Sequence, residues 1–287
     1  TLICPAMNDK MLQNPIVQDN IGKLKKNGYL VMESGEGELA CKTMGKGRLP
    51  EIPEILEEIT RLLAPKDFEG VKVLITAGPT EEPLDPVRFI TNLSSGKMGY
   101  SLASAAHRRG AKVTLISGPT SIPAPPVEKL IHVRTARDMH KAVLQNFKNA
   151  KIIIKAAAVA DYRPKTTAEE KIKKSGKNIA LELERNPDII AEIGKNKGNR
   201  ILVGFAMETQ NLFINAREKL INKNMDLIVA NNLRQEGAGF RTDTNIITII
   251  DRSGKSESLG KMTKMEAAGA ILDSVKKIMS GKGRVKK

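Results

Sequence analysis

The sequence predicts an α/β fold with a Rossmann-like, mainly parallel sheet that carries helices on both faces. Two observations lead to this fold class. Apolar runs such as 73–75 and 152–154 show no polar alternation, as expected of strands buried on both faces. From Gly70 onward, such runs alternate with helical segments, which favours parallel strands joined by helical crossovers.

Residues 1–66 are predicted to form a separate and incomplete α/β segment. Apolar residues indicate strands at 2–4 and 29–32, and a helix over 16–26 ends at the left-handed cap Asn27-Gly28. A glycine-rich loop is expected over 35–48. Pro53 marks the start of a second helix, whose spacing predicts a buried stripe of Ile52, Ile55, Leu56, Ile59, Leu62 and Leu63. Pro65 to Gly70 reads as a linker.

Residues 67–287 form the second predicted domain. Its strands are expected at 73–75, 112–117, 131–134, 151–158, 201–205, 227–230 and 246–250. Its helices are expected at 96–106, 136–147, from 186–189 onward, at 212–223 and at 263–279, where Thr263 and Glu266 form a capping box. Residues 81–88 are expected to be an extended arm and 159–174 a loop, and the tail from about 281 is expected to be disordered.

The amino-acid composition limits the classes of partner that this protein is expected to bind. The net charge of +15 suggests an anionic partner, but only 3 % of residues are aromatic and no nucleic-acid-binding motif is present. A basic cleft for nucleotide, phosphate and carboxylate groups explains the charge equally well. No stretch approaches the roughly 20 apolar residues of a membrane span, and no signal peptide pattern appears. The two cysteines, Cys4 and Cys41, suit a reducing cytoplasm.

The second domain is organised around residues 73–99. A buried strand, a turn of small residues and a helix start form a βα unit of the kind that binds nucleotides or phosphates. The GxGxxG and GxxxxGK[ST] fingerprints are both absent. The polar loop 91–97 instead places hydroxyl, amide and ammonium donors ahead of a helix N-terminus, which is anion-binding chemistry. The alternative is an ordinary surface loop in which Ser acts as a helix N-cap.

The string AGPTEEPLDPVRFITNLSSGKMG, residues 77–99, resembles the signature of phosphopantothenate–cysteine ligase, the second half of the bifunctional coenzyme A biosynthesis proteins. The resemblance implies a ligase that joins 4′-phosphopantothenate to L-cysteine through an acyl-nucleotide intermediate. It implies CTP as co-substrate in preference to ATP, because the fused enzymes use CTP, and a divalent metal, Mg²⁺ or Mn²⁺. It also implies a homodimer through the ligase domain.

The resemblance assigns roles to individual residues. Asn92 is expected to hold the acyl-nucleotide, Arg88 to serve the attack by cysteine, and Lys171 to contact the nucleotide and support activation. The substrate is expected at Ser94, Ser95, Gly96, Lys97 and Met98. The nucleotide is expected at Gly78, Gly118, Asp161, Asn186, Pro187, Asp188, Ile189, Phe205, Lys219 and Lys223. Asp161 follows a strand of small and apolar residues, and a carboxylate there suits Mg²⁺ or the nucleotide.

The first segment resembles the end of the flavin-dependent phosphopantothenoylcysteine decarboxylase, through PAMN at 5–8 and ELAC…GKGR at 38–48. In that family the Asn contacts the substrate carboxylate and the Cys donates a proton, which corresponds to Asn8 and Cys41. Lys42 stands where the family has Gly. The FMN-binding half and its catalytic His have no counterpart, since His107, His132 and His140 all fall in the ligase portion. We therefore expect FMN only in a complete decarboxylase and no decarboxylation by this chain alone.

Two competing functions make different predictions. A nicotinamide-dependent oxidoreductase requires a GxGxxG turn and an acidic ribose ligand after the second strand, and this chain has neither. A non-catalytic nucleotide- or nucleic-acid-binding module leaves Asn92, Asp161 and Lys171 without a joint purpose, and it predicts a steep salt dependence of binding. We expect no nucleic-acid or membrane partner, and a higher oligomer if the flavin half is supplied.

Overall fold

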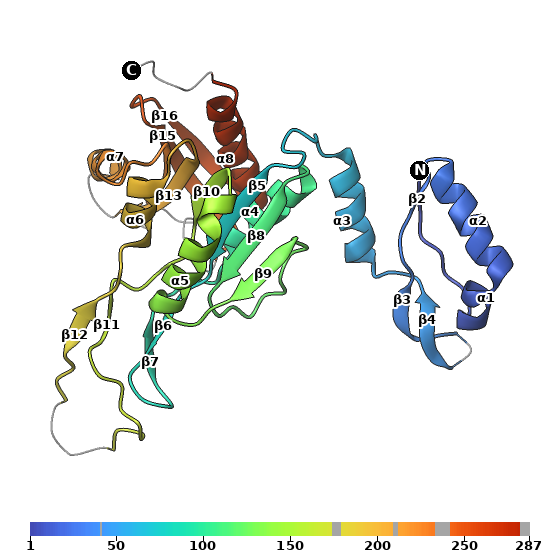
Figure 1. Ribbon diagram of the computed structural model, residues 1–287, viewed down its shortest axis with the longest axis horizontal. Helices are drawn as coiled ribbons and strands as arrows, with labels where there is room; N and C mark the ends of the chain where they lie inside the picture. The colour runs from blue at the N-terminus through green and yellow to red at the C-terminus, as the bar shows by residue number, and fades with distance from the viewer. Residues whose placement is uncertain (41, 174–178, 209–211, 233–241, 282–287) are drawn as a thin grey trace. The chain divides into compact units, whose positions relative to one another are not determined.

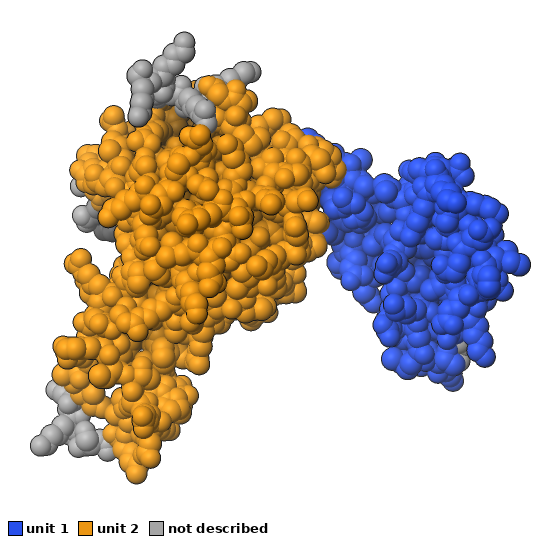
Figure 2. Space-filling view, viewed as in Figure 1, with its two compact units in different colours: residues 1–65 blue, residues 66–287 orange. Residues whose placement is uncertain are grey.

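The computed structural model describes residues 1–40, 42–173, 179–208, 212–232 and 242–281. The chain divides into two compact units, residues 1–65 and 66–287, which Figure 2 draws in different colours. The expected disordered tail falls on residues 282–287, outside the described ranges.

Unit 1 contains two small sheets and three helices. β1 (Leu2–Ile3) pairs in parallel with β2 (Leu30–Val31), and α1 (Asp9–Gln13) and α2 (Pro15–Lys26) lie between them in the chain. The expected loop over 35–48 is instead an antiparallel hairpin of β3 (Gly35–Glu38) and β4 (Met44–Arg48). Gly47 makes this possible, because a Cβ there would lie 2.1 Å from the carbonyl oxygen of Met7.

The predicted buried stripe of α3 (Ile52–Leu63) is wrong. The helix begins at a capping box of Glu51 and Glu54, but none of its residues is buried. Ile52 is 68 % exposed and Leu63 is 83 % exposed. The buried residues among those described in unit 1 are Leu39, Gly47 and Pro50. The spacing correctly marks an amphipathic helix, but unit 1 supplies too little apolar surface to cover its apolar face.

Unit 2 is built on one eight-stranded sheet (Figure 1). Six strands are parallel and lie in the order β9-β8-β5-β10-β13-β14, which is the order 3-2-1-4-5-6 of a doubly wound fold. Two antiparallel strands complete the sheet beyond β14. The strands are β5 (Lys72–Ala77), β8 (Lys112–Ser117), β9 (Lys129–His132), β10 (Ile152–Lys155), β13 (Ile201–Glu208), β14 (Leu227–Asn232), β15 (Thr244–Asp251) and β16 (Ser256–Thr263). The fold-class prediction is confirmed.

Strand β16 was not predicted. Its sequence SESLGKMT is polar and mostly exposed, because an edge strand needs to bury little of its surface. Strand β10 is shorter than the expected 151–158, because the chain leaves regular pairing after Lys155. The central strands carry the core: Val73, Ile75, Ile152 and Ile154 point to one face, and Leu74 and Ile153 to the other.

Helices cover both faces of the sheet. On one face, α4 (Lys97–Arg108) and α8 (Lys264–Met279) pack against each other and form a core with the first set of strand residues. On the other face lie α5 (Ala136–Asn146), α6 (Ile189–Asn196) and α7 (Leu212–Asn222), with a 3₁₀ turn, η1 (Phe147–Asn149), after α5. The capping box of Thr263 and Glu266 begins α8 as predicted.

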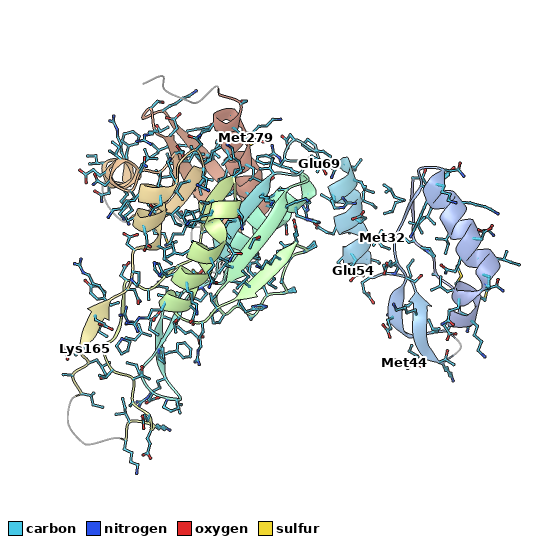
Figure 3. All side chains as sticks on the ribbon, in the orientation of Figure 1. Met32, Met44, Glu54, Glu69, Lys165 and Met279 are labelled. Carbon is cyan, nitrogen blue, oxygen red and sulfur yellow. The ribbon has the colours of Figure 1, made fainter. Side chains whose placement is uncertain are left out.

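Two hairpins project from the sheet (Figure 1). Residues 81–88 were expected to be an extended arm and 159–174 a loop, and parts of both form two-stranded ribbons. These are β6 (Glu81–Pro83) with β7 (Phe89–Thr91), and β11 (Tyr162–Pro164) with β12 (Leu183–Arg185). Backbone hydrogen bonds such as Ala168 N–H to the Leu84 carbonyl join the two ribbons side by side. Lys165, labelled in Figure 3, continues the second ribbon away from the sheet.

A buried cation holds the start of unit 2. Arg109, 8 % exposed, donates two hydrogen bonds to Asp67, of 2.8 and 2.6 Å, and one of 2.7 Å to Asp273 on α8. Its guanidinium also stacks on Phe68, which is fully buried. The expected linker 65–70 is therefore part of unit 2 from Lys66 onward. Hydrogen bonds from Arg109 hold the pKa of the Asp67 carboxyl at about 2, well below its ordinary value, although burial opposes the shift.

Asp67→Asn should destabilise unit 2 by about 2 kcal/mol near neutral pH, since the lowered pKa of Asp67 is a stabilisation of the folded state. The contribution is complete above the unfolded pKa of about 4 and is lost as pH falls toward about 2. Urea unfolding followed by circular dichroism at several pH values measures the difference. Asp273→Asn, which changes a side chain that is 62 % exposed, is the matched control and should cost less than about 1 kcal/mol. If the free energies of unfolding of the wild type and Asp67→Asn differed by the same amount at pH 7 and at pH 2, this account would be contradicted.

Candidate functional site

The candidate site lies where the order of the parallel strands reverses. From β5 the chain runs outward through β8 and β9 to one side, and then returns to place β10 on the other side of β5. The crossover connections therefore leave β5 and β10 in opposite directions, and a crevice opens beyond the carboxyl ends of these two strands. A cavity of about 320 Å³ occurs there. Its lining comes from the loop before α4 and the start of that helix, from the end of β10 and the segment after it, from β13 and β14 near their carboxyl ends, and from the starts of β15 and α8.

One wall is the polar loop that leads into α4. Asn92, Ser94, Lys97 and Met98 line the cavity, and the Asn92 side chain donates a 3.0 Å hydrogen bond to the Ala158 carbonyl. The helix start lies against the end of β5, and only glycine permits this approach: a Cβ at Gly99 would lie 2.5 Å from that of Ala77. The free N–H groups of the first turn of α4 are thereby brought to the cavity.

The opposite wall is the segment that follows β10. Ala156, Ala157 and Ala158 line the cavity together with Asp161. Two threonines of the β5 segment hold this wall in place. The Thr76 hydroxyl accepts a 3.2 Å hydrogen bond from Ala157 N–H, and the fully buried Thr80 accepts one of 3.0 Å from Ala160 N–H. Small side chains leave the backbone exposed to the cavity, so a ligand can reach its polar groups.

Polar residues that sequence reasoning missed complete the lining. Asn231 at the end of β14 and Asn245 at the start of β15 are each 4 % exposed. Among the described residues, the Asn231 Oδ1 is a buried polar atom without a hydrogen-bond partner. The sequence could have indicated Asn231 as a site residue. It follows the apolar run LIVA, just as Asp161 follows a run of small and apolar residues. Such an acceptor suits a ligand N–H or O–H.

The cavity is electropositive. Among the described residues, Lys97, Lys155 and Lys264 line it, against a single lining carboxylate, Asp161. The Lys97 ammonium forms a 2.6 Å ion pair with Asp243, and Lys264 donates to the carbonyls of Thr242 and Thr244. Burial lowers the pKa of both Lys155 and Lys264. Because buried like charges repel, the cavity favours a ligand with several negative charges.

The structure brings part of the expected site together. The expected site residues that line the cavity are Asn92, Ser94, Gly96, Lys97, Met98, Asp161 and Phe205. Ser95 lies within the same loop but does not line the cavity. Sequence reasoning missed Lys155, Met207, Asn231, Asn245 and Lys264. The sequence does mark Lys155 as a candidate site residue, because a lysine ends the apolar strand IIIK. It does not mark Lys264, which stands out only as the neighbour of the helix-capping Thr263.

Arg88 and Lys171 are not in the cavity lining. Arg88 lies on the first ribbon, where it pairs with the buried Asp85 and donates 2.9 Å to the Ile172 carbonyl. Ile172 N–H in turn donates to Asp85, so this clamp fixes the backbone beside the exposed Lys171. The hydrogen bonds from Arg88 hold the pKa of Asp85 well below its ordinary range, against the opposing effect of burial. The two expected functional residues thus lie near each other on the paired ribbons, away from the cavity.

The expected nucleotide residues of α6 and α7 form a neighbouring cluster that does not line the cavity. Asp188 is the N-cap of α6 and forms a 2.8 Å ion pair with Lys223. Burial would raise the pKa of Asp188, but the hydrogen bonds from Lys223 and Ala191 N–H lower it. Asn186 is held by its side-chain hydrogen bond to the Ala160 carbonyl, 2.9 Å, beside Asp161. Pro187 and Ile189 flank Asp188 in the sequence, and the exposed Lys219 lies on α7, but none of the three lines the cavity.

Gly78 and Gly118 have a structural role that explains their identity. A Cβ at Gly118 would lie 1.7 Å from the Pro79 carbonyl oxygen, and Gly78 has a φ of +75°. Neither residue lines the cavity. Both permit the loops after β5 and β8 to cross closely, which supports the wall that carries Asn92.

The PAMN and GKGR motifs of unit 1 lie together. Met7 N–H donates to the Gly47 carbonyl, 2.8 Å, so PAMN packs beside the GKGR strand. Asn8 is the N-cap of α1 and accepts from Lys10 N–H. Cys41 lies outside the described residues.

The described residues contain no group of three His, Cys, Asp or Glu side chains that could hold a metal by themselves. A single carboxylate at the cavity, Asp161, fits a metal that keeps most of its ligands from phosphate and water, as Mg²⁺ does. None of the described helices is long and apolar enough to cross a membrane.

Comparison with known proteins places both units. Residues 68–279 match the model of the DNA/pantothenate metabolism flavoprotein C-terminal domain, and residues 1–64 match the Flavoprotein model. The chain is 47 % identical to the coenzyme A biosynthesis bifunctional protein CoaBC of Bacillus subtilis, over 95 % of this chain and 68 % of that protein. It is 45 % identical to a cysteine/cysteine sulfinic acid decarboxylase from an unidentified prokaryote, over 95 % of this chain and 78 % of that protein. A crystal structure of the C-terminal domain of a CoaBC protein superposes with a TM-score of 0.66 at 41 % identity, covering 75 % of this chain and 99 % of that structure.

Thr80→Val should destabilise unit 2 by about 1–3 kcal/mol, because the isosteric change leaves the buried Ala160 N–H without its acceptor. Urea unfolding measures this cost. Thr248→Val, at a partly exposed hydroxyl that bonds Ser258, is the control and should change stability by less than about 0.5 kcal/mol. Equal effects of the two substitutions would show that the Thr80 hydroxyl does not support the cavity wall.

Proposed function

The chain belongs to the family of bifunctional coenzyme A biosynthesis proteins, and on this premise we propose that it is a phosphopantothenate–cysteine ligase that uses CTP. The observation that carries the proposal is the electropositive cavity at the switch point of the sheet. The loop 92–98, which resembles the ligase signature, faces Asp161 and the backbone of 156–158 across this cavity. Two of the substrates, a phosphorylated acid and a nucleoside triphosphate, are polyanions, which the three lining lysines suit.

The proposed reaction has two steps. A carboxylate oxygen of 4′-phosphopantothenate attacks the α-phosphorus of CTP, so that an acyl-cytidylate forms and pyrophosphate leaves. The amino nitrogen of L-cysteine then attacks the acyl carbon, so that the amide forms, CMP leaves and the nitrogen loses a proton. Both steps develop negative charge on oxygen, which fixed hydrogen-bond donors and cations stabilise.

Individual residues receive proposed roles. Asn92 bonds the acyl-cytidylate, and the start of α4 with Ser94 and Lys97 receives the acid substrate. Phe205 lines the nucleotide side of the cavity. Asp161 would hold Mg²⁺ or Mn²⁺ together with nucleotide phosphates, and the metal would supply charge neutralisation when bound. The cluster of Asp188 and Lys223 lies on the same side and is proposed to contact the nucleotide.

We also propose a homodimer through the ligase domain. The paired ribbons expose several apolar side chains, including Val87, Phe89, Tyr162, Leu181 and Leu183. Exposed apolar surface on projecting ribbons is typical of an interaction site. Arg88 and Lys171 lie on the same ribbons, and the dimer is proposed to bring them to a site. Light scattering after size exclusion measures the mass, and a monomer would contradict this part of the proposal.

For unit 1 we infer that it does not decarboxylate by itself. Its described residues bury only three positions and leave the apolar stripe of α3 exposed, so they do not form an enclosed flavin site. The described residues of unit 1 therefore do not fit FMN as a closed pocket, and no step of the reaction is derived through the flavin. Mass spectrometry of the ligase product after incubation with FMN checks this, and loss of CO₂ would contradict it.

The ligase proposal is tested by incubating the full chain with 4′-phosphopantothenate, Mg²⁺ and either CTP or ATP, with and without cysteine. We expect pyrophosphate release with CTP, and phosphopantothenoylcysteine only when cysteine is present. Removal of the metal by EDTA should abolish turnover, and Mg²⁺ or Mn²⁺ should restore it. Incubation of the chain with cysteine alone is a control for decarboxylation of free cysteine, because one relative is named a cysteine/cysteine sulfinic acid decarboxylase. No turnover with either nucleotide, from folded protein, would refute the ligase.

Asn92→Asp should lower kcat by about two to three orders of magnitude, because a carboxylate replaces a donor amide next to the developing negative charge. Single-turnover assays of pyrophosphate release and of amide formation show which step is impaired. Asn149→Asp, the same change at an exposed residue of η1, is the matched control and should leave kcat unchanged. Equal rates for Asn92→Asp and the wild type would remove Asn92 from the site.

A further inference from the structure

Lys155 lies at the carboxyl end of a central strand of the parallel sheet, and nothing in the assigned site accounts for it. It ends β10, between Thr76 of β5 and Gly204 of β13 in the strand register. Its three predecessors, Ile152, Ile153 and Ile154, are fully buried. Burying a lysine at this place costs free energy unless its ammonium contacts a negative charge. The residue lines the cavity.

Within the described ranges, the Lys155 side chain forms no hydrogen bond and no ion pair. Its strand neighbours Thr76 and Gly204 carry no charge. The surrounding charged groups are Asp188, Lys223 and Asp161. Asp188 is already paired with Lys223 and also accepts from Ala191 N–H. Burial, with the nearby Lys223 ammonium, lowers the pKa of Lys155, while Asp188 and Asp161 oppose this shift.

The other two lysines of the cavity differ from Lys155 in this respect. Lys97 is paired with Asp243, and Lys264 donates to two backbone carbonyls at the start of β15. The N–H groups of the Lys155 ammonium are therefore available to a ligand. Lys155 lies between two sides of the site. On one side lies the loop with Asn92, and on the other lie Asp188 and Lys223.

We propose that Lys155 is a nucleotide-phosphate ligand of this enzyme, bonding a non-bridging oxygen of the α-phosphate at which the carboxylate attacks. The inference rests on the proposed ligase function and adds to it a residue that the resemblance did not assign. During activation the bond from the carboxylate oxygen to phosphorus forms and the bond to pyrophosphate breaks. Lys155 keeps its proton throughout and stabilises the negative charge on the phosphoryl oxygens.

A purely structural role is the alternative, in which the aliphatic stem of Lys155 packs and the ammonium extends toward water. Lys155→Met separates the two, because it keeps the stem and removes the charge. Lys155→Arg keeps the charge with a different geometry. Lys112→Met, at the exposed first position of β8, is the matched control. Thermal unfolding of each variant establishes that it is folded.

The experiment measures binding of CTP, inorganic triphosphate and cytidine by calorimetry, together with pyrophosphate release. We expect Lys155→Met to weaken CTP and inorganic triphosphate binding by about ten- to a hundredfold, as loss of a charge-assisted hydrogen bond does, and to leave cytidine binding unchanged. Lys155→Arg should recover most of the affinity, and Lys112→Met should match the wild type.

Three results would overturn the inference. They are unchanged CTP binding in Lys155→Met, an equal loss of cytidine and CTP binding, and a wild-type protein that binds neither CTP nor inorganic triphosphate. If Lys155→Met or Lys155→Arg is unfolded, the other variant decides by the same binding comparison, and unfolding of both would assign Lys155 to the structure. Failure of the ligase proposal is recognised separately, because it appears as wild-type binding of CTP without product.

Discussion

The pairing of β5 with β10 is the constraint on which the rest of unit 2 depends. Residues 152–155 of β10, of which the three isoleucines are buried, pair in register with residues 73–76 of β5, and the chain leaves the two strands in opposite directions. The cavity lies at this divergence. The divergence brings residues 92–98 and 155–161, which are more than fifty positions apart in the sequence, to opposite walls of one site.

Close backbone approach keeps these walls in place. Gly99 allows α4 to begin against Ala77, and Gly118 allows the loop after β8 to pass the Pro79 carbonyl. Thr76 and Thr80 satisfy backbone donors of the segment after β10. Small residues and buried hydroxyls thus perform the positioning, so that the polar side chains of the cavity remain available to a ligand. The site is rigid in its backbone and cationic in its lining, which suits polyanionic substrates.

The two units differ in how much of their apolar surface they cover. Unit 2 buries the sheet between two helical layers and ties its first residues to α8 through Arg109. Unit 1 has the hairpin and helices of an α/β segment, but α3 leaves its apolar stripe exposed. Amphipathic spacing reports the propensity of a helix to pack, and packing itself requires a second surface. The proposed ligase chemistry accordingly belongs to unit 2.

The sequence by itself determined the fold class, the capping box of α8, the identity of the family and much of one cavity wall, because these depend on local spacing and on contiguous motifs. It singled out Asn92, Ser94, Lys97 and Asp161, which line this cavity. It did not find β16, the ribbon strands or the hairpin of unit 1, since exposed polar strands carry little apolar pattern. Only the tertiary structure decided that Lys155, Asn231 and Lys264 share a cavity, while Arg88 and Lys171 lie on the ribbons. Strand order and crossover geometry are non-local, so they bring together residues whose separation in the sequence carries no sign of their contact.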